Sequence, residues 1–340
     1  MVNNPKVAVV ILNYSTRNWL EKFLPSVLAT DYSNLEIVVA DNASKDDSVE
    51  FIKTQYPQIT LLQFHKNFGF TGGYNKALSL VEAEYFVLLN SDIEVESNWL
   101  KPLVILAESD KQIAAIQPVI LDWKKKRHYE YAGAAGGFID KYAYPFCRGR
   151  IFDTVEQIKE HYQQTQEVFW ASGAGLFINA ALFKEVGGLD NEFFAHMEEI
   201  DLCWRLKNKG YKIMVCAESQ IYHVGGATLA MGHPRKTYLN FHNGLAMMAK
   251  NLPRKSLYFT LFMRLVLDHV AAYKFLFTGK VSHFFAVAKA HFRFITSLRH
   301  WTKQNHNHYQ LKTVKGLYPR SIVLDYFLRG KKKFSDLEQF

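Results

Sequence analysis

Residues 7–41, VAVVILNYSTRNWLEKFLPSVLATDYSNLEIVVAD, contain two short apolar runs joined by a stretch of helical periodicity. The runs Val7–Leu12 and Leu35–Ala40 are typical of buried strands, and Arg17–Ala29 is typical of an amphipathic helix. Further strands are expected at Ile59–Gln63, Tyr85–Leu89 and Ile113–Gln117, and further helices at Lys45–Gln55, Gly73–Glu82 and Ser97–Ala107, with Ser44 and Ser97 as N-caps. This order predicts an α/β protein, with a mainly parallel sheet covered by helices on both faces.

Polar residues follow three of the expected strands, where sheets of this kind bind ligands. Asp41 follows the second strand, and its carboxylate could accept from a nucleotide base or a ribose hydroxyl, or could simply cap a turn. NFGFTGGYN (67–75) follows the third, and its glycines allow close backbone approach to a phosphate or a sugar ring. It matches neither GxGxxG nor a Walker loop, so dinucleotide-binding and NTPase functions lose support.

Asn90 and Asp92 follow the fourth strand, in FVLLNSDIEV (86–95). An Asn-x-Asp pair at a strand end can offer oxygen ligands to a divalent cation that bridges two phosphates. The alternative is a solvated turn.

The segment FFAHMEEIDLCWRL (193–206) contains three acids in four residues. On a helix Glu198 and Asp201 are i,i+3 neighbours, while Glu199 faces about a quarter turn away. A carboxylate here could act as a general base on a hydroxyl, or the acids could stabilise the N-terminus of the helix. His223 follows an expected strand and could bind a metal or a phosphate, or make a structural hydrogen bond.

Residues 121–168 interrupt the strand–helix alternation and are expected to form an insertion or a long flap. Regular structure is expected to return at Val168–Ile178. It continues with helices near Ala180–Val186 and Glu198–Asn208, a strand at Lys212–Ala217 and a short run at Ile221–Tyr222.

Taken in order, the motifs VVILNY, DNAS, NFGFTGGYN, LLNSD, SGAG, GGLDNEFF, MEEIDLCWRL and YHVGG resemble the family 2 glycosyltransferases with the GT-A fold, particularly the rhamnosyltransferase-like branch. The resemblance covers about residues 5–245. It implies the GT-A (nucleotide-diphospho-sugar transferase) fold, with a C-terminal helical extension added here. It also implies inverting transfer from a nucleotide-diphosphate sugar, assisted by Mg²⁺ or Mn²⁺.

The resemblance also implies a role for each motif. Asp41 would hold the base or ribose, together with the backbone of Leu12, Asn13 and Tyr14. Asp92 and His223 would bind the metal ion. The other implied donor contacts are Asn67, Gly69, Gly72, Gly73, Asn75, Asn90, Ser91 and Gly173, and the implied catalytic motif comprises Glu199 as the base with Glu198 and Asp201.

The chain departs from the family's pattern at several positions. Asn-Ser-Asp (90–92) replaces a motif with two aspartates, which weakens the expected metal site. Related sequences often carry Arg-Asn near the present His242–Asn243, so the diphosphate charge would be left to the metal and to other donors. Glu in place of Asp as the base adds one methylene, so Glu198 remains an alternative to Glu199.

The net charge of +9 is concentrated in a C-terminal tail. Residues 251–340 contain 16 Lys and Arg against 4 Asp and Glu, whereas the first 250 residues contain 25 against 28. Apolar residues recur at helical spacing in residues 257–298, with basic residues between them, and Gly279 is expected to separate two helices. Such helices lie in an anionic membrane interface, although they could instead pack on a catalytic domain at 1–250 or on another subunit.

The sequence contains neither a recognisable signal peptide nor a run of 18 apolar residues, and its three cysteines lack ligand spacing. We therefore expect a reduced, cytoplasmic protein that is peripheral on the inner face of the cell membrane.

These features predict a glycosyltransferase that uses a nucleotide-diphosphate sugar and a glycan or glycolipid acceptor. A sugar-nucleotide-binding protein without catalysis is the main alternative. A membrane-docked nucleic-acid binder is a weaker one, because no nucleic-acid-binding module is recognisable, and nucleic acid is not an expected partner.

Overall fold

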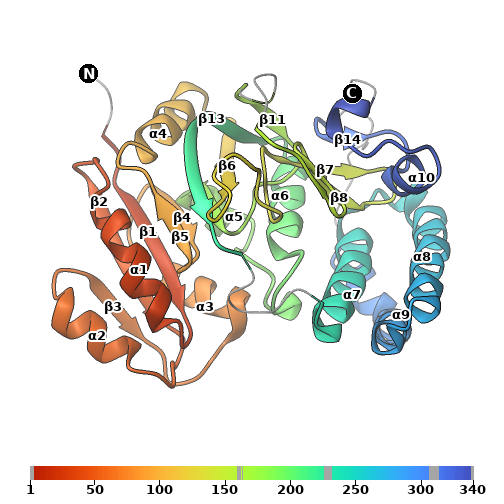
Figure 1. Ribbon diagram of the computed structural model, residues 1–340, viewed down its shortest axis with the longest axis horizontal. Helices are drawn as coiled ribbons and strands as arrows, with labels where there is room; N and C mark the ends of the chain where they lie inside the picture. Colours follow the sequence, from red (N-terminus) through yellow and green to blue (C-terminus); the bar gives the residue numbers. More distant parts are fainter. Residues whose placement is uncertain (1–3, 159–161, 163, 226–231, 306–313, 338–340) are drawn as a thin grey trace.

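The computed structural model describes residues 4–158, 162, 164–225, 232–305 and 314–337. Within these residues, nine strands form a central mixed sheet in the order β11-β13-β6-β12-β4-β1-β2-β3, with β5 paired to β13 (Figure 1). The strands are β1 Val7–Asn13, β2 Leu35–Asp41, β3 Thr60–Gln63, β4 Tyr85–Leu89, β5 Ile93–Val95, β6 Ile113–Asp122, β11 Gln166–Val168, β12 Gly175–Asn179 and β13 Lys212–His223.

The switch point of the sheet lies between β1 and β4. Strand β1 pairs in parallel with β2 on one side and with β4 on the other. The chain therefore places β2 and β3 on one side of β1, and then β4 on the opposite side. The register sets Asn13 beside Asp41, and Ile11 beside Leu89. The polar segments that follow β1, β2 and β4 therefore meet at one edge of the sheet, where such folds bind ligands.

Helices cover both faces of the sheet because strand residues alternate between two cores. Val7, Val9 and Ile11 pack in a core with α1, α2 and α4, whereas Ala8 and Val10 pack in a core with α3, α5 and α6. The helices are α1 Arg17–Leu28, α2 Ser48–Gln55, α3 Gly69–Leu78, α4 Leu100–Ser109, α5 Ala180–Glu185 and α6 Glu198–Asn208. The predicted α/β class and the helices on both faces are confirmed.

Three predicted helix starts are wrong. The N-cap positions are Asp47 for α2 and Trp99 for α4, rather than Ser44 and Ser97. Ser44 instead lies in the loop after β2, where its hydroxyl oxygen accepts hydrogen bonds from Asn13 Nδ2 and the Ser15 amide. Helix α3 begins at Gly69 and not at Gly73, because the loop after β3 is short and Gly69 adopts a positive φ of 76°.

The segment predicted as a flap forms most of a second, smaller sheet. Its order is β10-β9-β8-β7-β14 within the described residues. The strands are β7 Gly137–Asp140, β8 Pro145–Cys147, β9 Arg150–Ile151, β10 Thr154–Val155 and β14 Leu317–Tyr318. β14 comes from the far end of the chain and pairs with β7 in parallel, so the C-terminal residues complete the flap.

The C-terminal helices pack side by side at one end of the molecule (Figure 1). They are α7 Pro234–Asn251, α8 Arg254–Phe277 and α9 Val281–Lys303, followed by the short α10 Ile322–Phe327. Gly279 lies between α8 and α9, as predicted. None of the helices in the described ranges combines the length and the apolar character needed to cross a membrane.

A buried ion pair within α8 is hydrogen-bonded to the flap. Arg264 Nε donates to Asp268 Oδ1 (3.0 Å), and Arg264 Nη1 donates to the carbonyls of Tyr142 and Ala143 (3.0 and 3.1 Å). The Tyr144 hydroxyl donates to the same Asp268 oxygen (2.6 Å). The tail therefore packs on the rest of the chain through polar as well as apolar contacts.

Candidate active site

Asp41 belongs to a hydrogen-bonded network at the carboxyl ends of β1 and β2. Asn13 Nδ2 donates to Asp41 Oδ1 (3.0 Å) and to Ser44 Oγ (2.9 Å), and the Ser44 amide donates to Asp41 Oδ2 (3.0 Å). Asn13 and Asp41 are both buried. Each Asp41 oxygen accepts one of these hydrogen bonds, which orients the carboxylate and leaves lone pairs for a ligand.

Thr16 links this network to β4. Its hydroxyl donates to Asn13 Oδ1 (2.5 Å) and lies 2.9 Å from Ser91 Oγ. Leu12 and Tyr14, on either side of Asn13, are half-buried. Since Ser91 immediately precedes Asp92, the residues expected to hold the nucleotide and those expected to hold the metal share one continuous edge.

The first amides of α3 are used within the protein. The amides of Phe70 and Thr71 donate to the Phe194 carbonyl (3.1 and 3.4 Å), and the Gly69 amide donates to Asn67 Oδ1 (2.8 Å). Asn67 and Gly69 therefore anchor the start of α3. The N-terminus of this helix does not offer those three donors to a phosphate.

The other residues of this motif hold α3 against its neighbours. A Cβ atom at Gly73 would lie 2.7 Å from the Leu12 side chain, so glycine permits the close contact with β1; Gly72 lies beside it in the same turn. Asn75 Nδ2 donates to the Leu189 carbonyl (2.6 Å), and Asn75 Oδ1 accepts from the Leu189 amide (3.0 Å). These contacts fix α3 to the loop that leads toward α6.

Asn90, Asp92 and His223 converge at the end of β4. His223 Nε2 lies 3.2 Å from Asp92 Oδ1 and 3.5 Å from Asn90 Nδ2. His223 Nδ1 lies 3.4 Å from Glu130 Oε2, in the flap segment. Burial alone would lower the pKa of His223, but hydrogen bonds and charges from Asp92 and Glu130 outweigh it and raise the pKa to about 10.

These side chains fit a divalent cation that is shared with a ligand. Asp92 and His223 are both buried, and β5 and β13 hold them together, since the Val224 amide donates to the Asp92 carbonyl (3.1 Å). Glu130 behind His223 matches the common pattern in which a carboxylate orients a metal-binding imidazole. No cluster of three or more metal-binding side chains is found in the described ranges.

Glu198 and Glu199 begin α6 close to the same edge. Glu199 is half-buried, and a Cβ atom at Gly173 would lie 3.6 Å from Glu199 Cβ and 3.5 Å from the Phe70 ring. Ala174, which follows Gly173, accepts from the Asn90 amide through its carbonyl (3.0 Å). The start of β12 therefore lies between Glu199 and the Asn90–Asp92 segment.

The two glutamates differ in their surroundings. Burial raises the pKa of Glu199 to about 7, and burial together with the charge of Glu199 raises the pKa of Glu198 well above its usual value. Within the described part of the chain, one Oε atom of each carboxylate is shielded from solvent and has no hydrogen-bond partner. Glu198 is the more buried of the two residues. Glu199 thus combines a raised pKa with partial exposure, which suits proton exchange near neutral pH.

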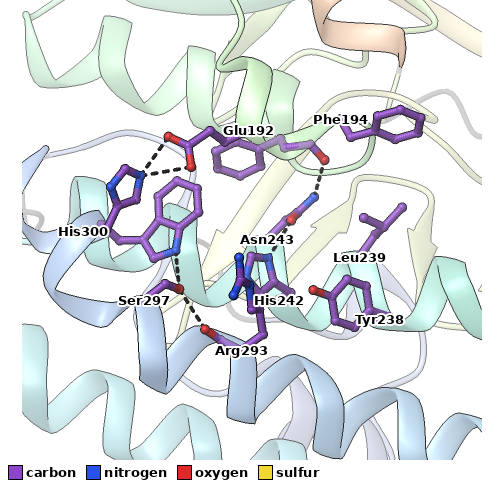
Figure 2. Close-up of a pocket in the computed structure, with 11 residues that line it drawn as sticks. Glu192, Phe194, Tyr238, Leu239, His242, Asn243, Arg293, Ser297 and His300 are labelled. Atoms are coloured by element: carbon purple, nitrogen blue, oxygen red, sulfur yellow. Dashed lines mark hydrogen bonds and ion pairs between the residues drawn. The ribbon is translucent and has the colours of Figure 1, made fainter. Parts of the chain in front are cut away.

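Asn243 on α7 holds the loop that leads to these acids. Its Nδ2 atom donates to the carbonyl of Phe193 at 2.9 Å (Figure 2). It also donates to the carbonyls of Ala195 and His196, at 3.0 and 2.9 Å. Three residues of this loop, Phe194, His196 and Met197, have positive φ. Such strained backbone persists only where its surroundings fix it, so Asn243 determines the path by which the chain enters α6.

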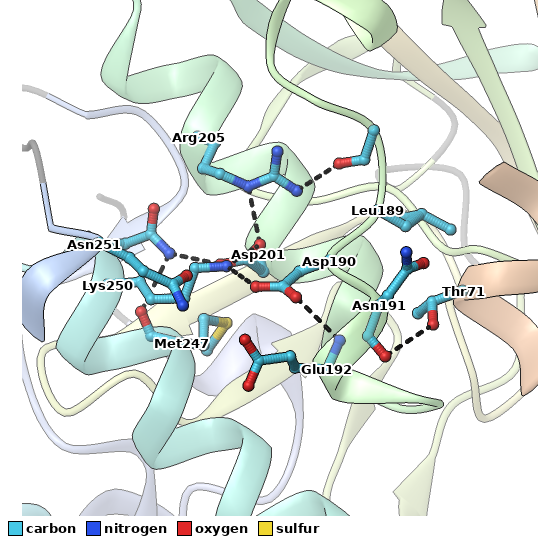
Figure 3. Close-up of polar contacts among 12 residues, drawn as sticks. Thr71, Leu189, Asp190, Asn191, Glu192, Asp201, Arg205, Met247, Lys250 and Asn251 are labelled. Atoms are coloured by element: carbon cyan, nitrogen blue, oxygen red, sulfur yellow. Dashed lines mark hydrogen bonds and ion pairs between the residues drawn. The ribbon is translucent and has the colours of Figure 1, made fainter. Parts of the chain in front are cut away.

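Asp201 differs from its neighbours, because it lies in a buried ion-pair cluster. Its Oδ2 accepts from Arg205 Nε (2.8 Å) and Lys250 Nζ (3.1 Å), and its Oδ1 accepts from Asn251 Nδ2 (2.7 Å) (Figure 3). Lys250 also pairs with Asp190 (2.5 Å). Burial opposes ionisation, but Arg205 and Lys250 overcome it and lower the pKa of Asp201. Both oxygens of Asp201 are therefore engaged within the protein.

Sequence reasoning identified the acids at the sheet edge but missed several of their partners. Thr16, Asn42, Glu130 and Asn243 each contact a predicted site residue or its loop. Thr16, Asn42 and Glu130 are single polar residues with no selective signal in the sequence, whereas Asn243 is marked only by the Arg-Asn pair of related sequences. Gly226, in the YHVGG motif, lies outside the described residues.

The mixed sheet, its switch point and the acids at its carboxyl edge define a GT-A glycosyltransferase. Residues 8–184 match the family described as Glycosyl transferase family 2, and the chain belongs to that family. It is therefore a glycosyltransferase that uses nucleotide-sugar donors.

Two relatives are named as rhamnosyltransferases. The chain is 23% identical over 231 residues to N-acetylglucosaminyl-diphospho-decaprenol L-rhamnosyltransferase of Mycobacterium tuberculosis, covering 63% of this chain and 75% of that protein. It is 24% identical over 215 residues to the rhamnosyltransferase WbbL of Escherichia coli, covering 61% and 79%.

A solved structure shares the fold. The mannosyltransferase PcManGT of Pyrobaculum calidifontis, in complex with GDP-Man and Mn²⁺, superposes with a TM-score of 0.54 at 16% identity, over 89% of this chain and 84% of that one. The predicted GT-A fold is thereby confirmed.

Proposed function

We propose that this protein moves a sugar from a nucleotide-diphosphate donor to a hydroxyl group of a lipid-linked glycan precursor, with inversion at the anomeric carbon. The observation that carries the proposal is the position of Glu199 across Gly173 and Ala174 from Asn90 and Asp92. A base on one side of Gly173 and Ala174 and a phosphate-binding edge on the other suit direct displacement of the diphosphate by the acceptor hydroxyl.

In this displacement the acceptor oxygen forms a bond to the anomeric carbon while the bond to the diphosphate oxygen breaks. The nucleoside diphosphate leaves with the electron pair, and the hydroxyl proton passes to Glu199 Oε. Base and leaving group must act on opposite faces of the sugar, as in inverting glycoside hydrolysis. Asp41 and Asn13 would hold the base or ribose, and Ser91 and Gly173 would line the donor.

Asp92 and His223 would hold Mg²⁺ or Mn²⁺, which would supply positive charge to the departing diphosphate. Lys236 on α7 offers a second positive charge near this edge. Burial lowers the pKa of Lys236, and the positive charge of Arg150 lowers it further. The negative charge of Glu130 raises the pKa of Lys236, so Lys236 lies within electrostatic range of both Glu130 and Arg150.

We assign Asp201 a positioning role in place of the catalytic role expected for it. Its carboxylate fixes α6 to α7 through Arg205 and Lys250, and thereby fixes the direction in which Glu199 points. Glu198 is the alternative base, and its deeper burial argues against it.

The lipid-linked acceptor is proposed from two observations. The mycobacterial relative is named for a decaprenol-linked substrate. In addition, α8 and α9 expose a row of large apolar side chains, which include Phe259, Phe262, Phe277, Phe285 and Phe292, each at least 58% exposed. We propose that this surface, with the exposed lysines around it, rests on the anionic inner face of the cell membrane.

The test is transfer from nucleotide-diphosphate sugars to a synthetic N-acetylglucosaminyl-diphospho-lipid with a short prenyl chain. Glu199→Gln should abolish transfer while the donor still raises the melting temperature, and Asp92→Asn should weaken both transfer and metal-dependent donor binding. NMR of the product should show an inverted anomeric configuration. Full turnover by Glu199→Gln, or loss of turnover in Glu198→Gln alone, would overturn the assignment of the base.

A further inference from the structure

A pocket of about 410 Å³ lies between the loop before α6 and the helices α7 and α9 (Figure 2). Glu192 and Phe194 come from the loop, Tyr238 and His242 from α7, and Arg293 and His300 from α9. Its volume falls within the range of small-molecule sites, about 300–1,000 Å³. Asp41, Asp92 and Glu199 are not among the residues that line the pocket.

The pocket shares a wall with the catalytic loop. Asn243 lines it and holds the carbonyl of His196, two residues before Glu198. Phe194 also lines it, and the Phe194 ring contacts the start of α3, since a Cβ atom at Gly69 would lie 2.7 Å from that ring. A ligand in this pocket would therefore lie next to the segments that carry the base and the donor site.

The lining suits a sugar that carries a negative charge. Tyr238 and Phe194 provide partly exposed aromatic rings, and the floor is formed by the buried Trp301 and Leu239. Polar groups around the rings can bind hydroxyls. A few polar groups set among apolar and aromatic side chains are usual for sites that bind small molecules.

Arg293 gives the pocket its preference for an anion. Glu192 and His300 pair with each other, with His300 Nε2 at 2.8 Å from Glu192 Oε1, so the carboxylate of Glu192 is engaged. Arg293 has no carboxylate within ion-pair distance among the described residues. A guanidinium in this position can bind a phosphate through two hydrogen bonds.

The same helix connects the pocket to the apolar surface. Phe292, which precedes Arg293, and Ile295, two residues after it, are 71% and 57% exposed on α9. A sugar diphosphate held at Arg293 could therefore extend its lipid along this surface without turning back across the pocket.

We propose that this pocket is the acceptor site, where the phosphate next to the acceptor sugar binds Arg293 and the sugar packs against Tyr238. The proposal rests on the proposed function. It adds the place where a phosphorylated saccharide would bind and the residues that would select it.

The first test is binding of N-acetylglucosamine 1-phosphate to the full chain, measured by NMR titration beside N-acetylglucosamine and inorganic phosphate. Arg293→Gln should weaken binding of the sugar phosphate about tenfold or more, because a charge-assisted hydrogen bond is lost. Tyr238→Ala should weaken binding of both the sugar and the sugar phosphate. Arg299→Gln removes another exposed charge from the same helix outside the pocket lining, and should leave binding unchanged.

The second test is transfer to the synthetic lipid-linked acceptor. Arg293→Gln should raise KM for the acceptor about tenfold while KM for the donor and donor hydrolysis by water stay at wild-type values. Equal acceptor KM in wild type and Arg293→Gln, or an equal loss in Arg299→Gln, would overturn the acceptor site. If wild type binds the sugar phosphate at Arg293 but transfers no sugar, the pocket stands and the proposed function fails.

Discussion

Glu199 has an environment that ties its charge to neutral pH. Burial raises the pKa of its carboxyl from 4.5 to about 7, so below that pH the group carries a proton and cannot accept another. We expect kcat/KM to rise about tenfold per pH unit up to about pH 7 and then to level off. A pH–rate profile measures this, and a flat profile through that range would contradict the role of Glu199 as the base.

The raised pKa of Glu199 also affects stability, and it favours the folded state at low pH rather than at high pH. The folded state binds the Glu199 proton more tightly than the unfolded state, so this contribution to stability is present below about pH 4.5 and is lost as the pH rises through about 7. We therefore expect Glu199→Gln to raise the melting temperature above pH 7 and to have little effect near pH 4. Equal shifts at both pH values would contradict this linkage.

Asp201 is the counter-charge of the buried Lys250 and the half-buried Arg205. In Asp201→Asn, Arg205 loses its carboxylate partner and Lys250 keeps only Asp190, so we expect a loss of roughly 3 kcal/mol in the free energy of unfolding. Urea denaturation measures it. The matched control is Glu185→Gln, which breaks an exposed pair with Lys209 and should cost less than about 1 kcal/mol. Similar losses in the two variants would show that the buried cluster has no special role.

At the scale of the elements, the sequence predicts the central strands well and the second sheet poorly. Val7–Asn13 and Tyr85–Leu89 are buried on both sides, so their apolar runs are continuous and easily recognised. β14 has only two residues, and it pairs with β7, about 180 positions earlier in the chain. No local pattern of residues encodes such a partner.

In the candidate site, too, some residues could be predicted from local sequence patterns and others could not. Asp41, Asn90 and Asp92 follow recognisable strands, so their meeting at one edge could be predicted. Glu130 and Asn243 reach the site through the irregular flap and through α7, and the burial of Asp201 depends on Lys250 from that helix. These contacts depend on how distant elements pack, which periodicity does not reveal.

The junction of β14 with the flap has little space. Gly316 has a φ of 87°, and a Cβ atom there would lie 2.3 Å from the Phe169 amide nitrogen. We expect Gly316→Ala to destabilise the fold by roughly 2 kcal/mol or more, measured by thermal unfolding. Gly330→Ala is the control, since Gly330 has a similar φ of 71° but no atom within 4 Å. An equal effect in both would indicate backbone strain alone and not the contact with Phe169.

The exposed surface of α8 and α9 is predicted to bind lipid. Replacing Phe262 and Phe292, which are 58% and 71% exposed, with serine should release the protein from vesicles that contain anionic lipid. Flotation with such vesicles, and with neutral ones, measures the binding and its charge dependence. Ile105→Ser is the control, because Ile105 is 61% exposed on α4, outside this surface. Wild-type protein that stays off anionic vesicles would refute the prediction.

Across the whole molecule, the proposed donor site is built by the N-terminal part of the chain and the proposed acceptor site by the C-terminal helices. The sheet edge built by the first 92 residues offers Asp41 and Asp92, whereas α7 and α9 line the pocket beside the catalytic loop. The charge follows this division, since the basic residues in excess belong to residues 251–340. Donor and acceptor would thus approach Glu199 from different parts of the fold.

The pairing of β14 with β7 has a consequence for how the protein is made. Residues 137–155 can form hairpins early in translation, but the small sheet lacks its last strand until residues 317–318 have been synthesised. Such distant contacts form slowly, and the open edge of β7 is exposed to other chains in the meantime. Nascent chains stalled before residue 314 should therefore aggregate or recruit chaperones, and yield in the cell should depend on how quickly the ribosome finishes this last stretch.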